Sequence, residues 1–279
     1  DPNAHIRAFL STNGPHPIRF SQLIEEDEAQ QEASSYMDFF RQPSSENYFT
    51  EAVLEGMFSA ILSEEEMEIY PSIVEIAHDI IAEGFSNAVI KPGETTTEDV
   101  MWWYEDRIRE LRLVTWFHPS VSIQRHQEDV GEFIDLFTNT EQQGVILPGD
   151  LLHVDFGITY LRLNTDTQQH AYVLRPGESR APAGIRVGLA TSNRLQDILT
   201  DNFVLGRTGN EILRSARAQA IEEDIRPSIY THPIGYHGHG AGPTIGMWDN
   251  QGDTVGRGDY PLYESTAHSI ELNSTVSIP

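Results

Sequence analysis

Two aspartates in the stretch HVDFGITYLRLNTD could bind a metal ion or exchange a proton. Asp155 and Asp166 stand eleven residues apart in apolar sequence that predicts two β-strands, one around Asp155 and one over 168–174. Burying an ionised carboxylate is costly unless it is paired or binds a metal. A hairpin here would bring both aspartates onto one face, where two nearby carboxylates cannot easily both ionise without a cation. The alternative is that both are solvated at the end of the hairpin.

Three histidines, His232, His237 and His239, occur in the glycine-rich segment THPIGYHGHGAGP (231–243). Glycine lets the backbone approach a ligand closely. If the segment is extended, alternation places His237 and His239 on the same side. These histidines could bind a metal, although clustered histidines also form ordinary local hydrogen bonds.

A third carboxylate, Glu271, stands between Ile270 and Leu272 in HSIELNSTV, a segment that predicts a β-strand. With Asp155, Asp166 and one histidine it completes a set in the order Asp, Asp, His, Glu. Carboxylates with one imidazole suit Mn²⁺, Co²⁺, Fe²⁺ or Zn²⁺ in a two-metal site better than a closed structural zinc site.

The motifs of several other enzyme classes are absent from the sequence. Without cysteine, the chain has no disulfide, no thiolate zinc site and no cysteine nucleophile. It contains no G-x-S-x-G, no P-loop and no G-x-G-x-x-G after a strand. Metal-assisted chemistry is therefore the interpretation that the residues favour.

Helices and strands must position these residues. Ser63 and Glu66 form a capping-box pattern, after which isoleucines recur at helical spacing. Further helices are predicted over 96–112, 186–203 and 208–224. Strands are predicted over 115–125, over LLHVDFGIT beginning at residue 151, and over 268–278.

One sequence pattern occurs twice. GETTTEDV (93–100) and GRTGNEIL (206–213) share G-x-T-x-x-E followed by an apolar residue, and each is a turn before a capped helix. Capping boxes are common, so chance could produce the match. The repeat nevertheless suggests two related α/β halves with a site between them.

Composition argues against partners that need a basic surface. The 279 residues carry a formal net charge of -25, and Lys91 is the only lysine. Nucleic acids and anionic membranes bind basic patches, so neither is an expected partner. There is no apolar run long enough to predict a membrane span, and residues 1–20 lack a signal-peptide layout. We expect a soluble chain, and its compartment, whether cytoplasmic or secreted and periplasmic, stays open.

The order HVDFG, Asp166, GHGAG and SIELN resembles the pita-bread-fold metallopeptidases, a family that includes methionine aminopeptidase, aminopeptidase P, prolidase and the non-peptidase creatinase. The resemblance covers residues 63–279, with 1–62 as a partial N-terminal helical segment. It implies an α+β fold of two pseudo-symmetric α/β halves, with a curved antiparallel sheet and outer helices. The stretch WFHPSVSIQR is most similar to a bacterial subgroup of Xaa-Pro peptidases.

The resemblance also implies a set of metal ligands. Asp155 would be the first ligand, Asp166 would bridge two metal ions, and Glu271 would be a further carboxylate ligand. His239 would be the imidazole ligand because YHGHGAG matches the family's G-H-G-φ-G pattern, with His237 as its rival. The expected cofactors are two divalent ions, Mn²⁺ first, with Co²⁺, Zn²⁺ or Fe²⁺ as alternatives.

The implied reaction is hydrolysis of N-terminal Xaa-Pro peptide bonds by a hydroxide that bridges the metal ions. Glu271 would accept and return the proton. His118 would steady the tetrahedral intermediate, and His237 or His239 would share that task. The expected partner is a peptide substrate, and a homodimer could cover apolar surface.

Two departures from the family pattern favour an alternative. The family has a second glutamate ligand after the one that matches Glu271, and no glutamate follows Glu271 here. The family's sizeable N-terminal domain is reduced to about 62 residues. We therefore expect either a C-terminally truncated fragment of a longer enzyme or a degenerate member. A degenerate member would be a non-catalytic domain that binds peptides or proteins, and a metal-free, creatinase-like hydrolase is a third reading.

Overall fold

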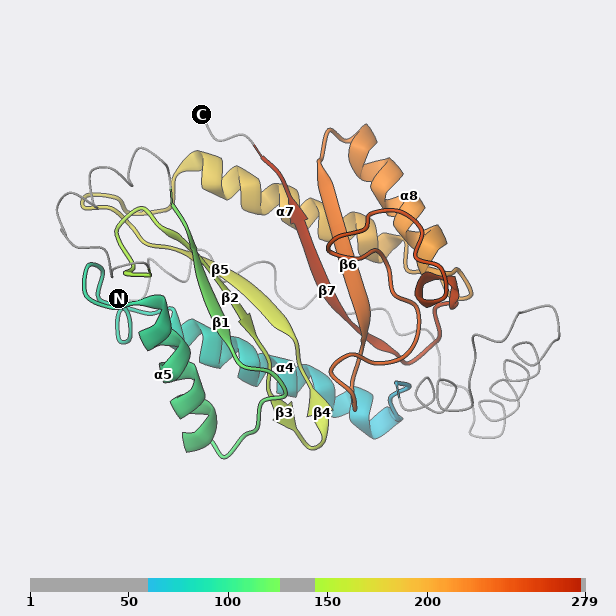
Figure 1. The fold of residues 1–279 in the computed structure, drawn as a ribbon, viewed down its shortest axis with the longest axis horizontal. Helices are drawn as coiled ribbons and strands as arrows, with labels where there is room; N and C mark the ends of the chain where they lie inside the picture. The colour runs from blue at the N-terminus through green and yellow to red at the C-terminus, as the bar shows by residue number, and fades with distance from the viewer. Residues whose placement is uncertain (1–59, 126–143, 277–279) are drawn as a thin grey trace.

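The computed structural model describes residues 60–125 and 144–276 (Figure 1). The predicted N-terminal helical segment, 1–62, lies almost entirely outside these residues, so it stays a prediction. The described chain consists of helices packed on antiparallel strands, as the sequence predicts.

The first half begins with two capped helices. In α4 (Glu64–Gly84), the Glu66 N–H donates to Ser63 Oγ and the Ser63 N–H donates to the Glu66 carboxylate, which confirms the predicted capping box. The helix α5 (Thr97–Glu110) starts with the same arrangement at Thr96. Such caps satisfy N–H groups that have no partner inside the helix.

These helices cover one face of a three-stranded antiparallel sheet. Its strands are β1 (Ser120–Gln124), β2 (Leu151–Phe156) and β5 (Thr167–Tyr172), in the order β1-β2-β5. Leu152, Val154 and Phe156 of β2 are buried in the same core as residues of α4 and α5. Because side chains alternate along a strand, His153 and Asp155 point to the opposite face.

The second half repeats this plan. After α7 (Ala183–Asp201), Thr208 and Glu211 cap α8 (Gly209–Glu222), as predicted, and the antiparallel strands β6 (Pro227–Ile234) and β7 (Ala267–Ser274) follow. Ile229 and Leu272 pack with α7 and α8 in a second core. In Figure 1 the strands of both halves lie in the middle of the molecule, with α4 and α5 on one side and α7 and α8 on the other.

A short hairpin ties the two halves together. It consists of β3 (Thr159–Tyr160) and β4 (Leu163–Asn164). The Asn164 side-chain amide donates to the carbonyls of Gly235 at 3.0 Å and Tyr236 at 2.9 Å, and its backbone N–H also donates to Gly235. The loop that follows β6 is therefore fixed to the first half by hydrogen bonds.

The strand β6 was not predicted. We treated 231–243 as one glycine-rich segment, whereas it is strand as far as Ile234 and bends from Gly235 to His239. Prolines interrupt strands, and β6 contains Pro227 and Pro233. A further short helical turn, η1 (Arg257–Asp259), precedes β7.

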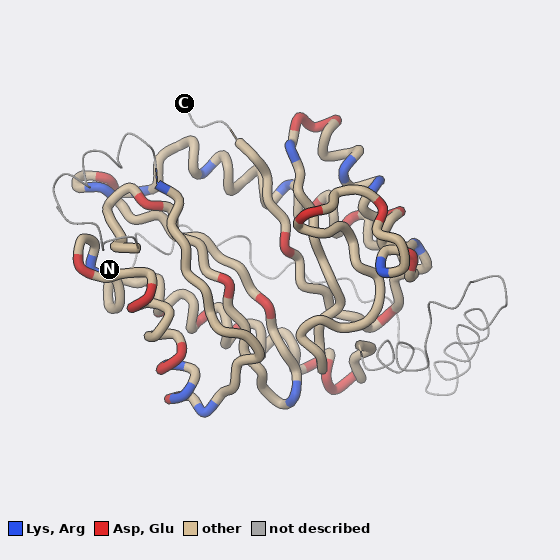
Figure 2. Tube along the Cα trace, in the orientation of Figure 1, with Lys and Arg blue, Asp and Glu red and all other residues tan. Residues whose placement is uncertain are grey.

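The negative charge is spread over the outer helices and loops, and some acidic positions also lie on the central strands (Figure 2). Within the residues that the structure describes, no helix combines the length and apolar character needed to cross a membrane.

Candidate metal centre

Asp166, His232 and Glu271 converge between the two halves. Each offers one ligand atom, and these atoms all lie within 4.8 Å of one another. Asp166 directly precedes β5, His232 lies on β6 and Glu271 on β7. The exposed fraction of their side chains is only 6%, 4% and 20%, respectively. The predicted convergence of Asp166 and Glu271 is thus present, and the histidine beside them is His232.

The register of β6 and β7 explains how His232 meets Glu271. His232 pairs with Ser269 and Tyr230 pairs with Glu271. All four therefore share the face turned away from α7 and α8. His232 and Glu271 are diagonal neighbours there, and His232 Nε2 lies 2.9 Å from Glu271 Oε1.

The two ring nitrogens of His232 have different surroundings. Nδ1 lies 2.9 Å from the carbonyl oxygen of Pro233, which can only accept, so Nδ1 carries the proton. Nε2 faces Glu271 and, at 3.5 Å, Asp166 Oδ2, yet it has no hydrogen-bond partner of acceptable geometry. In a neutral ring this nitrogen presents a lone pair to two carboxylates, an arrangement that calls for a proton or a metal ion.

The pKa of His232 shows the effect of the carboxylates around its Nε2. Burial lowers its pKa, but the contacts with Asp166, Glu271 and the Pro233 carbonyl outweigh that effect and raise the pKa to about 9. Without a metal, a proton therefore takes the position between the imidazole and the carboxylates.

Asp155 completes the group from β2. Burial is the main cause that raises its pKa to about 7, followed by the negative charges of Asp166 and Glu271. Its Oδ1 is buried without a hydrogen-bond partner. A buried, partnerless carboxylate oxygen and a partnerless imidazole nitrogen, next to two further carboxylates, form a donor set that fits a divalent metal ion.

His239 lies beside the group of ligand atoms. Its ring centroid is 4.4 Å from that of His232 and 5.2 Å from that of Trp116. Trp116 is fixed by a 2.8 Å hydrogen bond from its Nε1 to the Thr165 carbonyl. It also packs so close to Gly238 that a Cβ at that position would collide with the indole. Burial and the neighbouring His232 lower the pKa of His239, so its ring is neutral near pH 7.

Two other predicted residues have different contacts. His237 is exposed, and its ring lies beside Tyr236. His118 is half exposed, with Nδ1 2.7 Å from Glu105 Oε1 and its ring next to Trp102. The contacts described for these two histidines do not include the clustered carboxylates.

From the sequence we named His232 among three histidines but weighed only His239 and His237 as the imidazole ligand, because YHGHGAG matches the family motif. The structure places His232, not His237, next to Asp166 and Glu271. The β-forming residues Ile229, Tyr230 and Thr231 immediately before His232 are the signal that could have placed it in a strand.

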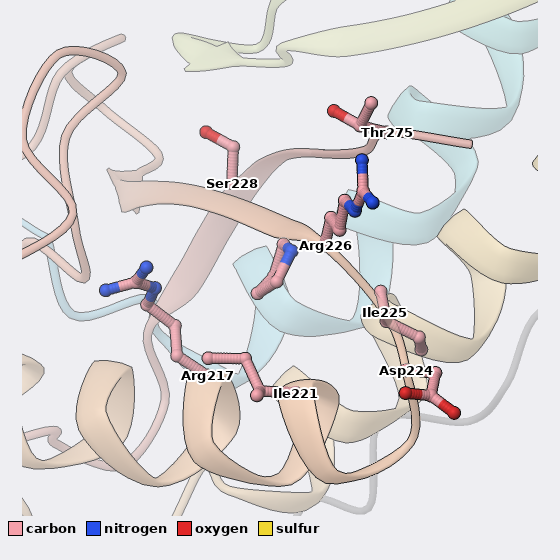
Figure 3. Close-up of a pocket in the computed structure, with 8 residues that line it drawn as sticks. Arg217, Ile221, Asp224, Ile225, Arg226, Ser228 and Thr275 are labelled. Atoms are coloured by element: carbon pink, nitrogen blue, oxygen red, sulfur yellow. The ribbon is translucent and has the colours of Figure 1, made fainter. Parts of the chain in front are cut away.

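A separate cavity of about 640 Å³ lies between the end of α8 and the start of β6. Figure 3 shows the guanidinium groups of Arg217 and Arg226 pointing in different directions around it. None of the clustered carboxylates and histidines lines this cavity, so it belongs to a different part of the fold from the candidate metal centre.

Comparison with known proteins identifies the family. The sequence model of metallopeptidase family M24 matches residues 72–276, most of the chain. No curated protein matches the sequence.

Several solved structures share the fold at low sequence identity. They include an X-Pro aminopeptidase from Thermotoga maritima (18% identity, TM-score 0.52, 79% of this chain and 61% of that one). Aminopeptidase PepP from Pseudomonas aeruginosa (14%, TM-score 0.58) matches over 91% of this chain and 59% of its own. The Xaa-Pro dipeptidase from Bacillus anthracis (18%, TM-score 0.52) matches over 79% and 59%. The chain thus spans about three fifths of the length of these proteins, and the predicted pita-bread fold is confirmed.

Proposed function

The chain belongs to metallopeptidase family M24, and on that premise we propose that it is a metal-dependent peptidase that hydrolyses N-terminal Xaa-Pro bonds. The observation that carries the proposal is the buried group formed by Asp166, His232 and Glu271, with Asp155 beside it. The preference for proline draws support from the names of the similar structures, an X-Pro aminopeptidase and an Xaa-Pro dipeptidase.

Asp155, Asp166, His232 and Glu271 are the proposed metal ligands, with Mn²⁺ as the first candidate. Divalent ions held by these residues would lower the pKa of a water molecule and polarise the scissile carbonyl. The partnerless Asp155 Oδ1 and His232 Nε2 support this assignment, because a ligated metal would satisfy both atoms. His232 takes the position that the family resemblance gave to His239.

Glu271 is the proposed proton carrier. Its carboxylate would accept the proton of the attacking water and return it to the leaving nitrogen, which for a prolyl substrate is an imide nitrogen. One of its oxygens already faces the ligand group, while the other accepts a hydrogen bond from Gln168.

His239 is the proposed donor to the developing oxyanion. It is exposed next to the buried ligands, and its lowered pKa keeps it neutral, so one ring N–H can donate without adding positive charge. The roles that the resemblance gives to His118 and His237 stay predictions. His118 would have to exchange its contact with Glu105 for one with substrate.

The experiment is metal stoichiometry together with hydrolysis. The chain and its Asp155→Ala variant would be reconstituted with Mn²⁺ and analysed for bound metal, then assayed on Xaa-Pro peptides and on matched peptides without proline. We expect two ions per chain in the wild type, their loss in the variant, and cleavage only of the proline peptides. One ion would contradict the dinuclear site. A chain without metal or activity would favour the non-catalytic binding domain.

A further inference from the structure

Gln168 connects the two halves beside the candidate metal centre. It lies on β5 directly opposite Asp155 of β2. Its side-chain Nε2 donates to Glu271 Oε2 at 3.2 Å, across 103 residues of sequence. Its Oε1 lies 2.9 Å from the ring Nε2 of His153. His153, Gln168 and Glu271 thus form a continuous chain of hydrogen bonds.

Only one arrangement of hydrogens satisfies this chain. An ionised carboxylate can only accept, so the NH₂ group of Gln168, and not its oxygen, must face Glu271. The amide oxygen then faces His153, whose Nε2 must carry a hydrogen. Turning the amide round would place its oxygen against the Glu271 carboxylate and lose that hydrogen bond, although the other His153 tautomer could still accept from the amide NH₂. The Glu271 carboxylate therefore fixes the direction of the amide, and the amide oxygen in turn fixes the His153 tautomer with hydrogen on Nε2.

The position of His153 is fixed in turn. It stands two residues before Asp155 on the same face of β2, opposite His170 of β5. The two imidazole rings pack at 4.9 Å between centroids. His153 is half-buried, with its ring packed against His170 and its Nε2 at Gln168 Oε1.

We propose that Gln168, oriented by His153, is a positioning residue that fixes the Glu271 carboxylate for metal binding and proton transfer. The inference rests on the proposed function of Glu271. By holding Oε2, Gln168 leaves Oε1 directed at His232 and Asp166, where the metal ligands converge. Partners that orient a ligand in this way typically change metal affinity or activity 10- to 100-fold when they are removed.

The first test uses the metal-free chain. Gln168→Met keeps the approximate shape of the side chain and removes both polar groups. In ¹⁵N spectra of the histidine rings, with His153 assigned through His153→Phe, the wild type should show the hydrogen on Nε2. Gln168→Met should lose that preference. Identical His153 signals in both proteins would overturn the proposed hydrogen-bond chain without any reference to metal.

The second test measures Mn²⁺ affinity by calorimetry and peptide hydrolysis by kcat and KM. Gln168→Met should weaken Mn²⁺ binding about 10- to 100-fold and lower kcat at saturating metal, with KM for the peptide little changed. The matched control is Gln169→Met, because Gln169 pairs with Val154 on the opposite face of β5 and should bind Mn²⁺ like the wild type.

Variants of His153 provide an independent test of the positioning role. His153→Phe should reproduce part of the loss, whereas His153→Gln, whose amide can still donate to Gln168, should retain most of the affinity. These variants also carry the test if Gln168→Met does not fold. Wild-type affinity and kcat in both Gln168→Met and His153→Phe would overturn the positioning role alone. A wild-type chain that binds no Mn²⁺ would instead overturn the proposed function, and the positioning role with it.

Discussion

A hydrogen bond at Nδ1 of His232 fixes the orientation of its ring and therefore of Nε2. The Pro233 carbonyl takes the Nδ1 hydrogen, so Nε2 is left to face Asp166 and Glu271. His239 packs against this ring at a tilt of 53° but has its own, more exposed surroundings. The two histidines should therefore respond differently to the same substitution.

We predict that His232→Gln abolishes tight Mn²⁺ binding, whereas His239→Gln binds Mn²⁺ nearly as the wild type does. His239→Gln should instead lower kcat roughly 100-fold, because a donor to the oxyanion is removed or misplaced. Calorimetry and steady-state kinetics on both variants test this. A loss of metal in His239→Gln with retention in His232→Gln would reverse the assignment and restore His239 as the ligand.

The stability of the metal-free chain should depend on the protonation of Asp155. The folded-state pKa is raised to about 7, above the unfolded value, so this carboxyl stabilises the fold while protonated. Its contribution is complete below the unfolded pKa and is lost as the pH rises through 7. His232, whose pKa is raised to about 9, loses its own contribution at still higher pH.

The matching measurement is urea unfolding of the metal-free chain and of Asp155→Asn between pH 4 and 8. The wild type should lose about 2 kcal/mol more than the variant over this range, after a discount for the partial solvent exposure of Asp155. Parallel pH profiles for the two proteins would show that Asp155 is not the group responsible.

At the scale of elements, the hairpin of β3 and β4 connects the two halves through hydrogen bonds from Asn164 to the loop after β6. Asn164→Ala would remove the side-chain NH₂ group, so the Tyr236 carbonyl would lose this donor and the Gly235 carbonyl would keep only the Asn164 backbone N–H. We predict a loss of about 2 kcal/mol in the free energy of unfolding and weaker Mn²⁺ binding, because the loop after β6 is released. The exposed Asn273→Ala is the control. Equal stability of the two variants would mean that the connection does not depend on Asn164.

The sequence predicts those features that depend on interactions between residues close together in the chain. The capping boxes at Ser63 and Thr208 involve residues three positions apart, so they are visible in the sequence and are confirmed. Asp155 and Glu271 stand out because each is a carboxylate within an apolar strand. The position of His232 beside Glu271 and Asp166 depends on the pairing of β6 with β7 and on contact with the other half, and local sequence does not report such distant contacts. The two prolines of β6 also conceal the strand.

At the scale of the whole molecule, the excess of acidic residues lowers the stability of the folded chain. Forty-three aspartates and glutamates stand against 18 lysines and arginines, and many are distributed over the outer helices and loops (Figure 2). Self-repulsion of like charges destabilises the compact state, and salt screens it.

We therefore predict that the Tm of the metal-free chain rises as NaCl is increased from about 10 mM to 1 M, over which the screening length falls from roughly 30 Å to 3 Å. KCl should produce the same rise at equal ionic strength, because screening does not depend on the identity of a monovalent cation. Differential scanning calorimetry measures both series. A Tm that stays flat or falls would show that repulsion between acidic residues does not limit stability.

The division of the proposed ligands between the two halves also has a consequence for biosynthesis. A ribosome makes Asp155 and Asp166 well before it makes His232 and Glu271. Until β6 and β7 have emerged and paired with one another, Asp155 and Asp166 lack the other two proposed ligands, His232 and Glu271. The complete set of proposed ligands exists only after β7 has been made, so metal uptake by this site would come late in translation.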